Sequence, residues 1–191
     1  DPLIKNYKDK TWSALSLPWI SIGYESKLTP LQLLAFYNAV ANNGRMVQPR
    51  IVREVRHSGQ LVKSFPVEVM RDSIASPVAL SKARAMMEGV VQHGTASVLN
   101  KSPFKLAGKT GTAQVFGRNP NGSAKSDTSW YAGYAPSTNP RYVAVMMVSQ
   151  GGFGAGTSGI GVRKIFETIF GVQGNRVNPE LAVFPEGKPP T

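Results

Sequence analysis

The sequence predicts an α+β fold in which an antiparallel sheet of three C-terminal strands is covered by packed helices and a C-terminal helix. Three observations support this prediction. Apolar residues recur at helical spacing in two segments of the first half of the chain. Strand-like segments follow one another in the second half, with short polar links that favour antiparallel pairing. A last segment, residues 158–170, has the apolar stripe of a helix that covers a sheet.

The first predicted helix begins after Thr29 and ends before Gly44. Thr29 can cap the helix, Pro30 suits its first position, and Gln32 completes a capping box. Gly44 suits the left-handed position that follows a helix. The apolar stripe of this helix consists of Leu33, Phe36, Tyr37 and Val40. The residues before the helix, 1–28, are expected to be irregular and rich in turns.

A β-hairpin and a second helix follow the first helix. Residues 51–56 and 61–65 flank a polar turn that contains Gly59, a pattern typical of a hairpin. The second helix begins with Ser76 as its cap, followed by a proline, and extends to Gly94.

The three predicted strands span residues 104–116, 128–135 and 142–149. The third strand is almost continuously apolar, so we expect it to be buried on both faces of the sheet. After the last helix the chain becomes rich in proline and polar residues. We therefore expect residues 175–191 to form a flexible tail.

The composition narrows the possible functions. The chain has 191 residues, of which 41% are hydrophobic, and this fits one globular domain. It has no cysteine and only two histidines, His57 and His93, so no disulfide and no metal site is expected. No apolar run approaches the ~18 residues that suggest a membrane span. The net charge of +11 is scattered, which argues against nucleic-acid binding.

The segment Ala107–Gln114 carries the sharpest functional signal. Within it, Lys109-Thr110-Gly111-Thr112 lies on the first predicted strand, and Lys-Thr-Gly is a motif of penicillin-binding proteins and β-lactamases. At average residue frequencies, such a four-residue pattern arises by chance in about one chain of this length in a hundred or fewer. For the triplet alone, an ordinary surface strand with an incidental lysine and threonines is a serious alternative interpretation. For the whole segment, this alternative is disfavoured.

These residue types fit the recognition of a carboxylate beside an acyl-transfer site. Lys109 supplies a fixed positive field, and the hydroxyls of Thr110 and Thr112 can hydrogen-bond a carboxylate. Gly111 allows a ligand or another backbone to approach closely. If the strand lies at the edge of the sheet, a peptide can also pair with its free backbone groups.

Further segments accompany Ala107–Gln114 along the chain: Ser21–Tyr24 followed by Leu28–Gln32, then Val91–Ala96 before it and Trp130–Pro136 after it. By these segments, and by their order, the chain resembles the C-terminal half of the transpeptidase domain of a class B penicillin-binding protein over residues 11–174. The part up to Val115 resembles division-type enzymes of one bacterial group, and residues 129–171 resemble elongation-type enzymes of another.

This resemblance implies a β-lactamase/transpeptidase-like fold and serine acyl transfer. In the family, a stem peptide ending in D-Ala-D-Ala acylates a helix-borne serine, D-alanine leaves, and a neighbouring amine takes the acyl group. β-Lactams acylate the same serine. The backbone N–H of Thr112 would form half of the oxyanion hole, so Lys109 and Thr112 are the candidate catalytic residues. Thr110, Gly111 and Thr112 are the candidate substrate-binding residues. No metal or cofactor is implied, because serine acyl transfer needs none.

Two of the three motifs known in the family have no convincing match. Ser102 and Lys105 fit Ser-x-x-Lys literally, but they flank a strand entrance, where their side chains cannot share one helical turn. Ser137 and Asn139 fit Ser-x-Asn, but they follow the Lys-Thr-Gly strand in a turn closed by Pro140. We expect both matches to be coincidental and the nucleophile to lie before residue 1.

The chain is therefore expected to be a fragment of a longer enzyme. Residues 1–174 would be the C-terminal part of a transpeptidase domain, and the missing N-terminal half would supply the nucleophile and a strand that pairs with the apolar third strand. The expected partners are the stem peptide and β-lactams, in an extracytoplasmic domain whose membrane anchor lies outside this chain. A non-catalytic module that binds peptides or the cell wall is the alternative.

Overall fold

The computed structural model describes residues 3–115, 117–118, 125–174 and 176–177. Its helices are α1 (Ser16–Ser21), α2 (Pro30–Ala41), α3 (Pro77–Gln92) and α4 (Ile160–Ile169), with a 3-10 turn at Ser97–Lys101 and a π-helical turn at Ala155–Gly159. The central sheet consists of β7 (Ala107–Ala113), β8 (Thr128–Ala135) and β9 (Tyr142–Val148). The remaining strands form two-stranded pairs: β1 (Leu3–Ile4) with β2 (Ser26–Lys27), β3 (Met46–Val47) with β6 (Val69–Arg71), β4 (Glu54–His57) with β5 (Gln60–Ser64), and β10 (Val172–Gln173) with β11 (Arg176–Val177).

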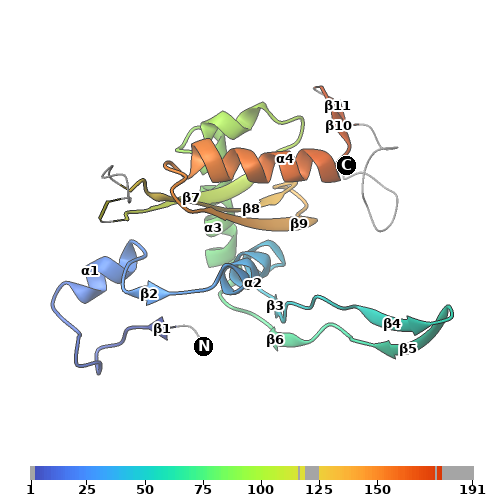
Figure 1. Cartoon of the computed structure of the whole chain (residues 1–191), viewed down its shortest axis with the longest axis horizontal. Coiled ribbons are helices and arrows are strands. Elements are labelled where there is room, and N and C mark those ends of the chain that lie inside the picture. The colour runs from blue at the N-terminus through green and yellow to red at the C-terminus, as the bar shows by residue number, and fades with distance from the viewer. Residues whose placement is uncertain (1–2, 116, 119–124, 175, 178–191) are drawn as a thin grey trace.

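The central sheet is antiparallel with the order β7-β8-β9, and it lies between α4 on one side and α2 on the other (Figure 1). The predicted α+β fold with three C-terminal strands and a C-terminal helix is confirmed. Strand β8 has the predicted bounds. Strand β7 is shorter than the predicted 104–116, and Phe104 instead packs edge-to-face against Phe170 at a centroid distance of 4.6 Å.

The larger hydrophobic core lies between the sheet and α4. It contains Val91, Ala96, Leu99, Leu106, Tyr131, Ala135, Val162, Phe166 and Phe170. The predicted apolar stripe of the last helix is confirmed at Val162, Phe166 and Phe170, which are fully buried, whereas Ile165 is 41% exposed. Helix α4 begins two residues later than predicted, because the residues before it form the π-helical turn.

The smaller core lies on the opposite face of the sheet. Its buried members are Val40, Ala41, Met87, Ala107 and Tyr134, from α2, α3, β7 and β8. Helix α3 contributes Met87 to this core and Val91 to the larger one. Helix α3 packs against β7, the edge strand of the sheet (Figure 1). It therefore contributes to the cores on both faces of the sheet, beside the start of β7.

Strand β9 is less buried than predicted. Its side chains are half-buried, and Met147 is 47% exposed. The reason is that the smaller core covers only part of its face. The cross-strand row that contains Tyr134 and Val143 packs there, whereas the row Gly111–Trp130–Met147 lies four residues beyond it. The expected burial of β9 on both faces was therefore wrong for the described residues.

Local signals account for the starts of the two longest helices. The Thr29 hydroxyl accepts from the Gln32 N–H (3.2 Å), and the Gln32 side chain accepts from the Thr29 N–H (2.9 Å), so the capping box is confirmed. Ser76 caps α3 in the same manner by accepting from the Ala79 N–H. Gly44 has a φ of +92°, as the predicted left-handed position requires.

The predicted hairpin is confirmed as β4–β5, and it projects away from the sheet (Figure 1). Ser58 and Gly59 at its tip both have positive φ, which matches the primed turns of hairpins. The chain before α2 is not wholly irregular as predicted, because it contains α1 and the β1–β2 pair. At the other end, β11 extends two residues into the predicted tail, while residues 175 and 178–191 lie outside the described residues.

Candidate active site

The Lys-Thr-Gly segment lies on β7, the edge strand of the central sheet. Within the described ranges, β7 pairs only with β8. Lys109 and Thr112 are exposed, and Thr110 and Gly111 are partly exposed. All four predicted site residues therefore lie together along one accessible strand edge, as the sequence indicates.

The two sides of β7 present different chemistry. Lys109 and Gly111 alternate along β7 with the same period as Ala107, which belongs to the smaller core. They therefore face the side of the sheet on which α2 packs, opposite Ala132 and Trp130. Thr110 and Thr112 alternate with them and face the α4 side. The Lys109 ammonium donates to the Thr110 carbonyl at 2.6 Å.

A buried tyrosine explains why a glycine precedes the lysine. Gly108 and Gly133 are cross-strand partners, and the Tyr131 ring lies over both. A Cβ atom at Gly108 would lie 2.3 Å from the Tyr131 hydroxyl, and one at Gly133 would lie 2.6 Å from the ring. The Tyr131 hydroxyl has no hydrogen-bond partner among the described residues, and burial raises the pKa of this phenol. The ring thus supports β7 directly beneath the motif.

Thr95 joins the site from the turn that follows α3. Its hydroxyl oxygen lies 2.9 Å from that of Thr110, and both side chains are accessible. The turn is tight at Gly94, where a Cβ atom would lie 2.8 Å from the Val90 Cα. Thr95 was not among the site residues predicted from the sequence. The signal at this position was the segment Val91–Ala96, on which part of the family resemblance rests.

The Thr112 hydroxyl has a different neighbour. It accepts from the backbone N–H of Gly154, in the turn before α4, at 3.3 Å. Phe153, the residue before this glycine, is 82% exposed. The Thr110 hydroxyl thus contacts a residue that precedes β7 in the sequence, and the Thr112 hydroxyl contacts a residue that follows the sheet.

The literal matches to the other two motifs do not contribute a catalytic pair. Ser102 follows the 3-10 turn in an extended conformation, and no helix contains both Ser102 and Lys105, as predicted. The Ser137 hydroxyl donates to Glu88 Oε1 at 3.1 Å, and Ser137 and Asn139 lie in the turn between β8 and β9.

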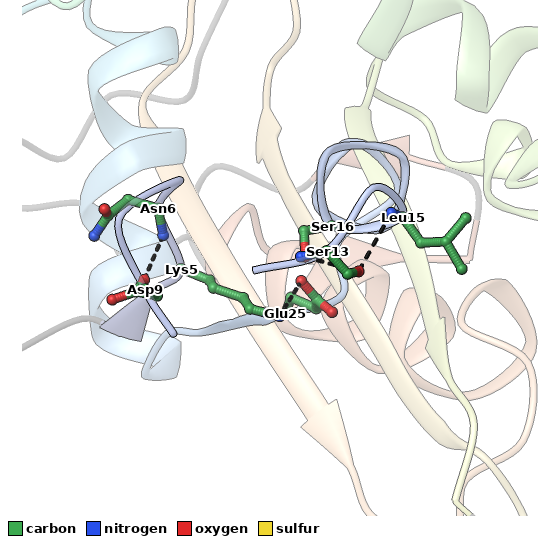
Figure 2. A network of polar contacts seen from close by, with 7 residues as sticks. All are labelled: Lys5, Asn6, Asp9, Ser13, Leu15, Ser16 and Glu25. Atoms are coloured by element: carbon green, nitrogen blue, oxygen red, sulfur yellow. Dashed lines mark hydrogen bonds and ion pairs between the residues drawn. The ribbon is translucent and has the colours of Figure 1, made fainter. Parts of the chain in front are cut away.

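A second polar cluster lies near the start of the described chain (Figure 2). Lys5 forms an ion pair with Glu25 at 2.9 Å, and this contact lowers the pKa of the Glu25 carboxyl. The Asp9 carboxylate accepts from the Asn6 N–H at 2.6 Å. Lys5, Asp9 and Glu25 also line a cavity of about 450 Å³. None of the predicted site residues belongs to this cluster, and its contacts stabilise the N-terminal segment instead.

The described residues give no sign of a metal centre or of a membrane span. Between residues 3 and 177, apart from the undescribed positions, no three His, Cys, Asp or Glu side chains are grouped so that they could hold a metal ion. The helices in the same ranges are too short or too polar to cross a membrane.

Comparison with known proteins gives a consistent result. The family model for the penicillin binding protein transpeptidase domain matches residues 4–171. The chain is 33% identical to penicillin-binding protein PbpB of Mycolicibacterium smegmatis, over 94% of this chain and 28% of that protein. It is 26% identical to peptidoglycan D,D-transpeptidase MrdA of Salmonella typhimurium, over 81% of this chain and 27% of that protein. The chain thus spans less than a third of the length of these relatives.

Solved structures show the same fold. PBP2 of Pseudomonas aeruginosa, crystallised in complex with WCK 5153, matches 83% of this chain and 34% of its own, with a TM-score of 0.66 and 26% identity. Penicillin-binding protein A of Mycobacterium tuberculosis, solved as a penicillin G acyl-enzyme complex, matches 79% of this chain and 34% of its own, with a TM-score of 0.64. At 23% identity, the second likeness concerns the fold alone.

Proposed function

The chain belongs to the penicillin-binding protein transpeptidase family, and we propose that it forms the substrate-anchoring part of a peptidoglycan D,D-transpeptidase that β-lactams acylate. The observation that carries this proposal is the accessible edge of β7, where Lys109, Thr110 and Thr112 lie together. The proposed substrate is a stem peptide that ends in D-Ala-D-Ala, and its terminal carboxylate binds beside this edge.

The hydroxyls and the ammonium group of β7 suit a carboxylate. Thr110 and Thr112 project on the same side of the strand, and both hydroxyls are hydrogen-bond donors that a carboxylate accepts. Lys109 adds a positive charge close to this edge, because its ammonium reaches the Thr110 carbonyl. An extended peptide can at the same time pair with the free backbone of an edge strand.

The proposed oxyanion donor is the backbone N–H of Thr112. On an edge strand, the peptide groups of alternate residues point away from the neighbouring strand. The contact between Lys109 and the Thr110 carbonyl at 2.6 Å supports an outward orientation at Thr110. Thr112 lies two residues further along and shares that orientation, so its N–H is available to a developing negative charge.

An uncovered part of the sheet supports the proposal that the nucleophile comes from sequence before residue 1. Lys109, Trp130 and Met147 lie on the same side of the sheet, beyond the smaller core, and Met147 is 47% exposed. An apolar sheet face needs a covering element. A helix from the missing N-terminal half would cover this face and bring a serine next to the Lys109 ammonium. The same half would supply the strand that pairs with β9.

The remaining parts of the proposal concern the setting of the enzyme. We place the domain outside the cytoplasm, where its substrate is found, with a membrane anchor in sequence that this chain does not contain. The reaction then needs no metal or cofactor, because a serine, a base and an oxyanion hole suffice for acyl transfer.

Labelling with a fluorescent penicillin tests the proposed function. The intact protein should be labelled on a serine upstream of residue 1, and an excess of unlabelled benzylpenicillin should prevent the labelling. Lys109→Ala should slow the labelling strongly, whereas Lys101→Ala, an exposed lysine outside β7, should not. The isolated chain should remain unlabelled. A covalent adduct at Ser102 would contradict the assignment of the nucleophile.

The second candidate is a non-catalytic module that binds peptides or the cell wall. It is favoured by one observation: the anchor residues are accessible, while no helix among the described residues carries a Ser-x-x-Lys pair. Titration of a D-Ala-D-Ala peptide into the intact protein separates the two candidates. Saturable, reversible binding that Lys109→Ala abolishes, without any acylation by penicillin, would establish the module and exclude the enzyme.

A further inference from the structure

Two buried serines join the start of β8 to the turn before α4. Ser129 and Ser158 are both fully buried. The Ser158 hydroxyl donates to the Ser129 carbonyl at 3.0 Å, and the Ser158 N–H donates to the Ser129 Oγ at 3.2 Å. The Ser129 hydroxyl donates in turn to the Ser158 Oγ at 2.8 Å. These bonds satisfy both hydroxyls in a site closed to water, so they fix the two segments relative to each other.

The serine pair also holds the glycine that contacts Thr112. The Phe153 carbonyl oxygen lies 3.2 Å from the Ser129 Oγ and is the alternative acceptor for its single hydrogen, and the Gly159 N–H donates to the Gly154 carbonyl at 2.8 Å. Gly154 is therefore bound through its carbonyl to the residue that follows Ser158 and through its N–H to Thr112. A Cβ atom on Gly154 would lie 2.6 Å from the Gly111 carbonyl oxygen, so only glycine brings the backbone this close to β7.

The contact between Gly154 and Thr112 has a fixed polarity. A backbone N–H can only donate, so the Thr112 Oγ1 is the acceptor of the 3.3 Å bond. The hydrogen of the Thr112 hydroxyl then remains available, and Thr112 is exposed. A carboxylate can only accept hydrogen bonds. The arrangement thus leaves the Thr112 hydroxyl with the polarity that anchoring a carboxylate requires.

We propose that Ser158 is a positioning residue for Thr112: the buried Ser129–Ser158 pair holds Gly154 against β7, and the Gly154 N–H turns the Thr112 hydroxyl hydrogen toward the substrate carboxylate. This inference rests on the proposed function and assigns a positioning residue to the same carboxylate-binding site. Ser158 itself does not touch the substrate, since it is fully buried. The π-helical turn that contains Ser158 fits this role, because such turns are frequent at functional sites.

The experiment measures the second-order rate constant of acylation of the intact protein by two probes. Benzylpenicillin carries a free carboxylate, and its methyl ester does not. The variants are Ser158→Ala, Thr112→Val and the double variant, and Ser137→Ala is the control for loss of a hydroxyl that forms a hydrogen bond away from β7. Thermal unfolding of each variant is recorded, and acylation is measured below the onset of unfolding.

We expect Ser158→Ala to slow acylation by benzylpenicillin about tenfold, the factor that corresponds to about 1.4 kcal/mol for a hydrogen bond to a charged group. Acylation by the methyl ester should be unchanged by this substitution. The double variant should be no slower than Thr112→Val alone, because Ser158 acts through Thr112. Ser137→Ala should behave as the wild type with both probes.

Several results would overturn the inference. The first is that Ser158→Ala lowers the rate constant of acylation equally with both probes. The second is that the double variant is acylated more slowly than Thr112→Val. The third is that Ser158→Ala is acylated by benzylpenicillin as fast as the wild type. A wild type that penicillin does not acylate removes the proposed function, and the inference with it. If Ser158→Ala does not fold, Ser158→Cys keeps the space filled with a weaker donor. Ser158→Cys must then slow acylation by benzylpenicillin by a smaller factor and leave acylation by the methyl ester unchanged. An unchanged rate with benzylpenicillin would contradict the proposal.

Discussion

The hydroxyl oxygens of Thr95 and Thr110 lie 2.9 Å apart, although one residue follows α3 and the other lies on β7. If Thr95 donates, the Thr110 hydrogen is free for a carboxylate, in the same manner as that of Thr112. We predict that Thr95→Val slows acylation of the intact protein by benzylpenicillin about three- to tenfold, the loss of one neutral hydrogen bond. Stopped-flow or gel-based labelling measures the rate.

Thr95→Ser is the matched control, because it keeps the hydroxyl and removes only a methyl group. It should retain most of the wild-type rate. A Ser variant as slow as the Val variant would show that the methyl group, and not the hydroxyl, supports the site.

Replacing Tyr131 by phenylalanine should leave the fold intact and raise its stability. The Tyr131 hydroxyl is buried without a hydrogen-bond partner among the described residues. Leaving such a group unpaired costs about 1–3 kcal/mol, part of which Tyr131→Phe should restore. Chemical denaturation measures the free energy of unfolding, with Tyr7→Phe as an exposed control that should change nothing. A less stable Tyr131→Phe would mean that the hydroxyl has a partner after all.

The same tyrosine predicts a dependence on alkaline pH. Burial raises the pKa of Tyr131 above its ordinary value of 10.0, so the folded protein holds this proton more tightly than the unfolded chain. The contribution to stability is fully present below pH 10 and is lost progressively as the pH rises above it. The free energy of unfolding of the wild type should therefore fall more steeply above pH 10 than that of Tyr131→Phe. Parallel curves would contradict this explanation.

Gly108→Ala should destabilise the protein severely and weaken the site with it. The added Cβ would lie 2.3 Å from the Tyr131 hydroxyl and 2.4 Å from its ring carbon. Overpacking of this kind typically costs about 1–3 kcal/mol, and more where the neighbour cannot move. Gly156→Ala is the matched control, because its Cβ would meet open space and its φ is not positive. Thermal unfolding of both variants measures the difference.

Thr29→Ala should remove the capping box of α2 and cost about 1 kcal/mol of stability. The Gln32 N–H would lose its bond to the Thr29 hydroxyl, although solvent can partly replace it at this exposed helix start, whereas the backbone N–H of residue 29 can still donate to the Gln32 side chain. Thr29→Ser keeps the hydroxyl and should retain the stability. An alanine variant as stable as the wild type would show that packing of α2 against the sheet fixes the start of the helix on its own.

The sequence predicted those parts of the fold that depend on neighbours in the chain. The start of α2 follows from Thr29, Pro30 and Gln32, which lie within four positions. The bounds of β8 were predicted without error, and the hairpin turn follows from Gly59. Strand β9 was predicted as a strand, but its burial was not, because burial depends on which elements cover each face of the sheet.

The candidate site divides in the same manner. Lys109, Thr110, Gly111 and Thr112 were predicted because they are contiguous on one strand. Thr95 and Gly154 were missed, since their contacts to β7 join residues 15 and 42 positions apart. No periodicity or local motif reports such distances. Helix α1 and the β1–β2 pair were not predicted, for a related reason. The Lys5–Glu25 ion pair, which helps to hold this segment together, joins residues 20 positions apart.

The projecting hairpin β4–β5 is a site at which the protein can be tagged. Its tip at Ser58 and Gly59 is exposed, and it lies in the picture well away from β7 and the sheet (Figure 1). Exposed loop tips of this kind tolerate insertions. A fluorescent reporter or an affinity peptide inserted between these two residues would therefore mark the protein in a living cell, or tether it to a sensor surface, while leaving the exposed edge of β7 open to solution.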